Sequence, residues 1–141
     1  MLTTVEKVLF LQDVDIFEFT TTDDLALIAA VTEEYEVPPG EILYKEGEMP
    51  DSMYMVVEGL VRLTRDGQEM MTAGPKDVFG TWALFDDEPR VVTAVAEEKT
   101  RLLRIDKEDF IDLLADYVEI TRSILKTIVK RLRRLMTRMK K

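Results

Sequence analysis

The six glycines of this 141-residue chain all lie between positions 40 and 80, and their spacing is the feature that most restricts the fold. Successive glycines are 6 to 12 residues apart, the length of one short strand with its turn. Glycine adopts the positive φ angles of tight turns without steric cost. Regular glycines at this interval predict the corners of a β-sandwich or barrel. The positions are Gly40, Gly47, Gly59, Gly67, Gly74 and Gly80.

The segments around these glycines have the composition of strands. From Ile42 to Ile105 the chain reads as short β-segments bounded by turn residues: EILYKEGE, SMYMVVEG, LVRLTRDGQEMMTAG and VVTAVAEEKTRLLRID. The strongest hairpin signal is Asp66-Gly67, because both residues tolerate the positive φ of a two-residue turn. Four methionines in these segments are interpreted as flexible core filling rather than as metal or cofactor ligands. They are Met53, Met55, Met70 and Met71.

Helical patterns flank the β region on both sides. Apolar residues at Val5, Val8 and Leu9 predict a first short helix. Thr22 is expected to cap a second, since acidic residues follow it and suit the positive end of a helix. After the β region, Asp106 is expected to cap a helix that continues to the C-terminus with a break near Asp116. We therefore expect a β-rich body over residues 1–116 and a helix over residues 117–141 that belongs to the same domain.

The C-terminal segment carries an apolar seam and most of the positive charge. Residues 120–141 contain nine basic and no acidic residues, whereas the first 119 contain ten basic and 28 acidic ones. The seam has the alternating three and four spacing of a coiled coil. Its members are Val118, Thr121, Leu125, Ile128, Leu132, Leu135 and Met139.

This pattern leaves several roles open for the segment. The seam favours a homodimer, and the alternative is that it packs on the chain's own β core. The basic residues also suit an anionic membrane surface or nucleic acid, and the helix could instead lead into an effector domain outside this chain. Reading of DNA is not expected, because no segment follows Lys141 that could form a helix-turn-helix.

Composition argues against an enzyme. The chain has no cysteine and no histidine, which removes zinc sites, thiolate nucleophiles and Ser-His pairs. We therefore expect a non-enzymatic protein without metal or cofactor. No apolar run approaches the roughly 20 residues of a membrane span, and the start lacks a secretory signal pattern. These features predict a soluble, cytoplasmic protein.

The ordered motifs resemble those of a known family. The chain contains Gly40-x6-Gly47-x3-Asp51-x2-Tyr54-x4-Gly59, followed by Phe79-Gly80 and Pro89-Arg90. This set resembles the cyclic nucleotide-binding domain of bacterial catabolite-activator-like regulators, protein kinase regulatory subunits and gated channels. The resemblance implies a jelly-roll-like β-roll flanked by short N-terminal helices and a long C-terminal helix. It also implies a regulatory domain that binds cAMP or cGMP and relays occupancy through its last helix.

The resemblance assigns roles to residues of the phosphate-binding cassette. Arg90 would bind the exocyclic phosphate, and a guanidinium offers phosphate oxygens a planar set of donors. Backbone amides near Ala83 and Val91 would complete the anion cradle, and Gly80 would allow the backbone to approach the ligand. The alternative for Arg90 is an ion pair with an acid of the same segment, namely Asp86, Asp87 or Glu88.

The chain also departs from the family pattern. Thr81 stands where the family places a glutamate that accepts the ribose 2′-hydroxyl, a loss that would weaken binding about tenfold to a hundredfold. Val91 and Val92 replace smaller residues beside the phosphate, and Asp87 adds a negative charge. Trp82 is expected to face the core. The alternative function is therefore a ligand-free, degenerate domain that acts as a dimerisation or interaction module.

Overall fold

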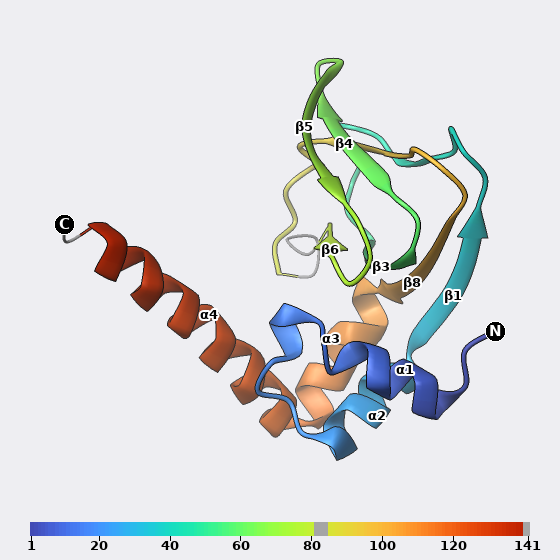
Figure 1. The fold of residues 1–141 in the computed structure, drawn as a ribbon. Coiled ribbons are helices and arrows are strands. Elements are labelled where there is room, and N and C mark those ends of the chain that lie inside the picture. Colours follow the sequence, from blue (N-terminus) through green and yellow to red (C-terminus); the bar gives the residue numbers. More distant parts are fainter. Residues whose placement is uncertain (81–84, 140–141) are drawn as a thin grey trace. The chain divides into compact units, whose positions relative to one another are not determined.

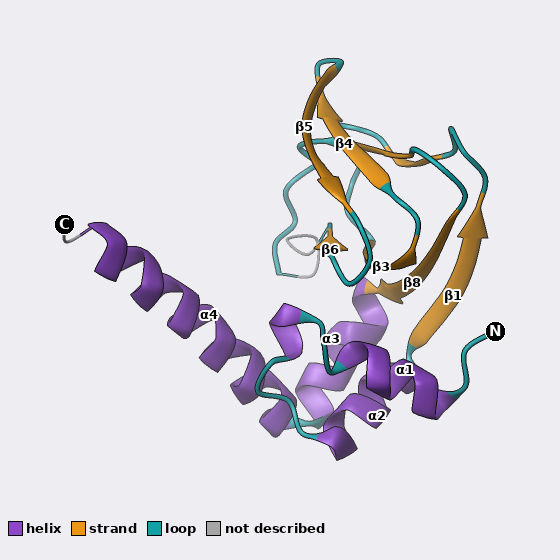
Figure 2. Cartoon of the chain, in the orientation of Figure 1, coloured by secondary structure: helices purple, strands orange, loops and turns teal. Residues whose placement is uncertain are grey.

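The computed structural model describes residues 1–80 and 85–139. These residues form two compact units, each described here by itself. The first unit holds residues 31–111 and every strand of the described residues, and the second holds residues 2–30 and 112–141, whose described part is helical or connecting (Figures 1 and 2).

The first unit consists of two four-stranded antiparallel sheets, which confirms the predicted β-roll. One sheet has the order β1 (Thr32–Val37), β8 (Thr100–Asp106), β3 (Ser52–Glu58) and β6 (Val78–Phe79). The other has the order β2 (Ile42–Tyr44), β7 (Thr93–Ala96), β4 (Val61–Arg65) and β5 (Gln68–Ala73). Inward side chains of both sheets form one apolar core. It comprises Val37, Tyr44, Tyr54, Val56, Val61, Leu63, Ala73, Phe79, Ala94, Ala96 and Leu102.

The β4–β5 hairpin turns where its sequence predicted. Asp66 and Gly67 have φ angles of 53° and 78°, as a tight two-residue turn requires. Arg65 pairs with Gln68 on either side of this turn. The hairpin fixes β5 at the edge of its sheet.

Strand β1 was not predicted, because its sequence TEEYEV is dominated by acids. In the structure it pairs with β8 along its whole length, from Thr32 opposite Ile105 to Val37 opposite Thr100. The side chain of Glu34 accepts a hydrogen bond of 2.9 Å from Arg101 of that neighbouring strand. Because the partner of Glu34 lies 67 positions away, no neighbouring residue in the sequence indicates that this acid belongs to a strand.

The second unit contains helices α1 (Thr4–Leu11), η1 (Asp15–Phe17), α2 (Thr22–Ala30) and α4 (Val118–Met139). Helix α3 (Lys107–Asp116) carries the chain from the first unit into the second, and only Tyr117 separates it from α4. The expected break near Asp116 is therefore present.

Two details of the N-terminal helices differ from expectation. Val5 and Leu9 are exposed, and α1 instead buries Val8 and Leu11. The hydroxyl of Thr21, rather than Thr22, accepts the N–H of Asp24 at the start of α2.

Helix α4 has a buried face that is distinct from its apolar seam. Ile120, Ser123, Ile124 and Thr127 are buried. Within the same unit, Ser123 shares a hydrogen bond of 2.9 Å with Thr20, and Lys126 and Lys130 each lie 4.8 Å from the centre of the Phe19 ring. The seam residues Leu125 and Leu132 remain exposed by 54% and 56%. No helix among the described residues is both long enough and apolar enough to cross a membrane.

Candidate functional site

The backbone of Arg90 forms two hydrogen bonds with one turn. Its N–H donates to the Glu48 carbonyl and its carbonyl accepts from the Gly47 N–H, each at 2.8 Å. These bonds pin the segment that precedes β7 against the turn that follows β2. The Arg90 side chain points inward and is only 5% exposed.

The Arg90 guanidinium is oriented by contacts from three other segments. Its Nη2 donates to the Ser52 carbonyl at 2.7 Å, and its Nη1 lies 3.4 Å from the Gly80 carbonyl oxygen. Its central carbon lies 3.9 Å from the centre of the Tyr44 ring, a cation–π contact. The buried Nε has no hydrogen-bond partner among the described residues. One strong donor of this cation is therefore left unsatisfied inside the protein.

No acid in its own segment neutralises Arg90. Among the described residues, its ion pair is with Asp51, at 3.7 Å, and the Asp51 side chain is 75% exposed. Asp51 is also 3.6 Å from Arg104, so it is shared between two arginines. The alternative of a pair with Asp86, Asp87 or Glu88 is wrong for this structure. Arg90 is a buried cation with only a partial, exposed counterion.

Tyr44 supplies an uncharged face to the arginine. Burial of the phenol raises the pKa of Tyr44 to about 12, although the positive charge of Arg90 acts in the opposite direction. The phenol therefore stays protonated at physiological pH. It binds Arg90 through its ring without cancelling the charge.

Gly80 provides the space that the guanidinium occupies. A Cβ atom at this position would lie 2.8 Å from Nη1 of Arg90 and 3.4 Å from the Ser52 carbonyl oxygen. Gly80 also has a φ of 75°, a backbone conformation that residues other than glycine rarely adopt. The resemblance predicted that Gly80 lets the backbone approach the ligand, and in the structure it lets the backbone approach Arg90.

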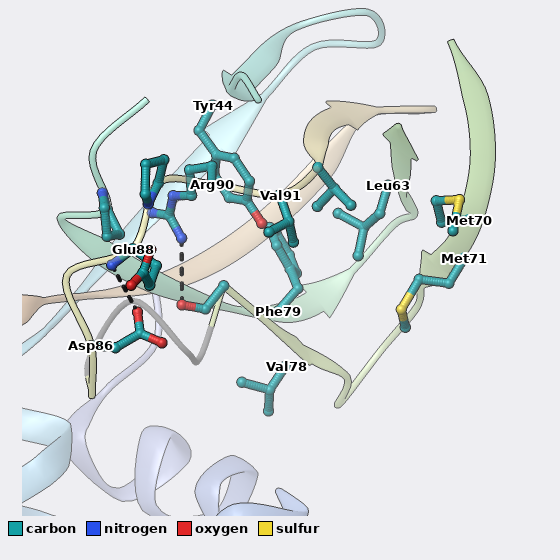
Figure 3. A pocket seen from close by; sticks show the side chains of 14 residues that line it. Tyr44, Leu63, Met70, Met71, Val78, Phe79, Asp86, Glu88, Arg90 and Val91 are labelled. Carbon is teal, nitrogen blue, oxygen red and sulfur yellow. Dashed lines mark hydrogen bonds between the residues drawn. The ribbon is translucent and has the colours of Figure 1, made fainter. Parts of the chain in front are cut away.

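A pocket of about 330 Å³ opens beside Arg90. Figure 3 shows Arg90, Asp86 and Glu88 at one end and Leu63, Met70 and Met71 at the other. The remaining wall is mainly apolar. It is formed by Tyr44, Pro50, Val78, Phe79, Gly80, Pro89, Val91 and Val92. The pocket thus combines one buried cation with an apolar surface.

The two methionines of this wall correct a prediction. Met53 and Met55 are fully buried, as expected of core filling. Met70 and Met71 are instead exposed by 56% and 53% and line the pocket from β5. The sequence could not separate the two pairs, because both lie in strand-like segments. Their different burial follows from the positions of β3 and β5 in their sheets.

Residues 85–87, which precede Arg90, contact the start of α3. The Lys107 ammonium donates to the Asp86 carbonyl and to the Asp87 carboxylate, both at 2.7 Å. This hydrogen bond and the lysine charge lower the pKa of Asp87. The ring of Phe85 also meets the ring of Phe110 edge to face, with centres 6.2 Å apart. An ammonium and an aromatic contact thus join this segment to one helix.

The predicted site residues fall into two groups. Gly80, Arg90 and Val91 line the same pocket, as the proposed cradle requires. Thr81 and Ala83, like Trp82, lie outside the described residues. The sequence reasoning missed Tyr44 and assigned Asp51 no role at the ligand site. Neither residue carries a local signal of its contact with Arg90, which is 46 and 39 positions away respectively.

Comparison with known proteins identifies relatives over most of the chain. The family model described as "Cyclic nucleotide-binding domain" matches residues 34–117. The chain is 30% identical over 124 residues to the "CRP-like cAMP-activated global transcriptional regulator" of Mycobacterium tuberculosis, covering 84% of this chain and 55% of the relative. It is 34% identical over 101 residues to the "Cyclic AMP receptor protein" of Thermus thermophilus, covering 68% and 47% respectively. The chain thus spans about half the length of these curated relatives.

Solved structures show the same fold. The N-terminal domain of a transcriptional regulator from Streptomyces coelicolor has a TM-score of 0.78 and 30% identity, covering 86% of this chain and 90% of that one. A cyclic nucleotide-binding-like protein from Brucella abortus has a TM-score of 0.69 and 29% identity, covering 77% and 97%.

Proposed function

Because the chain belongs to the cyclic nucleotide-binding domain family, we propose that it is a non-enzymatic regulatory domain that binds cAMP or cGMP through Arg90. The residues of the ligand site are Gly80, Thr81, Ala83, Arg90 and Val91. Occupancy of the site is relayed through residues 117–141, which include α4. The transcriptional activity that is named for longer relatives is a property of those proteins.

The buried and incompletely paired guanidinium carries this proposal. Removing a cation from water is unfavourable unless opposite charge and hydrogen-bond acceptors replace the water. Ser52 and Gly80 supply carbonyl acceptors, but among the described residues Nε has no partner and Asp51, which forms the ion pair, is exposed. A phosphate oxygen at Nε would complete both the charge balance and the hydrogen bonding of Arg90.

The pocket is suited to the rest of a nucleotide. Its volume of about 330 Å³ lies within the range of small-ligand sites. The main-chain N–H of Val91 donates to no described residue, so it is available as the second donor to the anion. Leu63, Met70 and Met71 offer an apolar surface to a base. Val91 lines this pocket but does not fill it.

The relay begins where residues 85–87, which precede Arg90, contact the start of α3. Lys107 and Phe110 hold Asp87 and Phe85, so a shift of this segment on binding displaces the start of the helix that leads to α4. The effect on α4 is a shift between populations that already exist. A nucleotide that prefers one state tenfold contributes about 1.4 kcal/mol to it.

A homodimer through α4 is the second part of the proposal. The seam residues Leu125, Leu132 and Leu135 are exposed by 53–56%, and the helix buries a different face within its own unit. The same observation supports the alternative function, a ligand-free dimerisation module in which the site has degenerated at Thr81, Val91 and Asp87. In either case the receiver of the signal is a second copy or an attached effector region. Contact with a membrane surface is the weaker reading.

Isothermal titration calorimetry with cAMP and with cGMP separates the two functions. We expect heat of binding that disappears in Arg90→Ala. Arg62→Ala is the matched control, because Arg62 pairs with Glu97 on the surface and should leave binding unchanged. Absence of heat at ligand concentrations below the millimolar range in the unmodified protein would refute the sensor and favour the dimerisation module.

A further inference from the structure

Glu88 is a pocket residue for which the proposed function has no role. Its side chain lines the pocket beside Arg90, and its carboxylate has no hydrogen bond or ion pair with any described residue. Resting on the proposed function, we propose that Glu88 accepts a hydrogen bond from a ligand hydroxyl that lies next to the ligand's anionic group. Glu88 would then be the residue that decides which anions Arg90 retains.

Glu88 and Arg90 lie two positions apart in the segment that leads into β7, and both line the same pocket. Pro89 between them restricts φ and so limits rotation of one relative to the other. The pocket therefore has a cation and an acceptor within three consecutive residues.

The neighbouring acids are already engaged. The Asp86 carboxylate accepts the Glu88 N–H at 3.2 Å, and Asp87 is bound by Lys107. Asp51 lies between two arginines and also accepts the Ser52 hydroxyl at 2.9 Å. Among the acids near Arg90 in the described chain, Glu88 alone lines the pocket with both carboxylate oxygens unused.

The pair Glu88 and Arg90 imposes two conditions on a ligand. A carboxylate beside the anion subsite repels a second negative charge, so monoanions are favoured over phosphate monoesters. An unpaired carboxylate also loses water when the pocket fills, which is unfavourable unless the ligand donates a hydrogen bond to it. The ligand class that meets both conditions is a monoanion with a hydroxyl on an adjacent carbon. A 3′,5′-cyclic nucleotide with its 2′-hydroxyl belongs to this class.

Calorimetry with cAMP and 2′-deoxy-cAMP tests this role. In the unmodified protein we expect cAMP to bind at least about tenfold more tightly, the effect of one hydrogen bond to a charged group. In Glu88→Ala the two ligands should bind within about twofold of one another. Binding of 2′-deoxy-cAMP should itself become a few-fold tighter in this variant, because a repulsive charge has been removed. A merely structural role of Glu88 would weaken both ligands together.

Two further variants and three outcomes complete the test. Glu88→Gln keeps the shape and a neutral acceptor, and should retain part of the preference for cAMP. Asp87→Asn removes an acidic charge that does not line the pocket, and should leave the ratio of the two affinities unchanged. A preference for cAMP that persists in Glu88→Ala, or equal binding of both ligands to the unmodified protein, overturns the role of Glu88 but not nucleotide binding. Failure of both ligands to bind the unmodified protein overturns the proposed function as well.

Discussion

The Arg90 guanidinium lies where a side chain at position 80 would be: a Cβ on Gly80 would lie 2.8 Å from Nη1 of Arg90. Because Nη1 belongs to a buried side chain held by Ser52 and Tyr44, it has little room to withdraw. The conformation of one residue is therefore a condition for the orientation of the other. The predictions below begin from this dependence.

Gly80→Ala is expected to weaken cAMP binding at least tenfold, because it displaces the guanidinium from the anion subsite. It should also lower the free energy of unfolding by more than about 1 kcal/mol, the usual effect of a side chain at positive φ. Gly67→Ala is the matched control. Gly67 has a φ of 78° with no atom within 4 Å of the added Cβ, so it should lose stability but keep its affinity. Equal affinities for cAMP in calorimetry of both variants would contradict the prediction.

Tyr44→Leu is expected to weaken cAMP binding about threefold to thirtyfold, since it removes a cation–π contact with a buried guanidinium. Tyr44→Phe keeps the ring and should bind cAMP as the unmodified protein does. Comparison of the two dissociation constants isolates the aromatic face from the hydroxyl. Equal dissociation constants for Tyr44→Leu and Tyr44→Phe would show that the ring does not position Arg90.

The raised pKa of Tyr44 predicts instability at high pH. The unfolded phenol ionises near pH 10, whereas the folded one does so at about 12. The stabilisation is therefore complete below pH 10 and is lost as the pH rises from 10 to 12. Urea unfolding across this interval should show a smaller decline in Tyr44→Phe. A decline of the same size in both proteins would assign the pH dependence to other groups.

Lys107→Met is expected to release residues 85–87 from α3 and to return the pKa of Asp87 upward toward the ordinary value of an aspartate. In the unmodified protein the lowered pKa contributes stability above the unfolded pKa, and this contribution is lost as the pH falls through the folded one. Carboxyl NMR titration measures the shift directly. Glu36 and Lys99 form an exposed pair at 3.1 Å, so Lys99→Met is the control that should leave Asp87 unchanged.

Substitution of Leu125 and Leu132 by aspartate is expected to convert a dimer into a monomer, because it places charges in the exposed seam of α4. Sedimentation velocity of the full chain measures the change. Arg133→Asp with Thr137→Asp is the control, since both positions are exposed on α4 but lie off the seam. A monomeric unmodified protein at micromolar concentration would refute dimerisation through this helix.

Much of the fold was predictable because its signals are local. The β4–β5 hairpin follows from Asp66 and Gly67, whose positive φ angles depend on their own side chains. The helix that follows Asp106 and its break near Asp116 were likewise predicted, and the apolar spacing from Val118 onward indicated the helix that became α4. Strand β1 was missed because Glu34 is accommodated by Arg101, which lies 67 positions away.

The sequence by itself determined where the chain turns in the β region, which segments other than β1 form strands and helices, and which arginine belongs to the family motif. These properties depend on backbone preferences and on residues within a few positions of each other. Only the tertiary structure decided that Arg90 points inward, that Tyr44 covers one of its faces, and that Met71 lines a pocket rather than the core. The physical reason is that burial and the partners of a charge are set by strands brought together from distant parts of the chain, as with Ser52, 38 positions from Arg90.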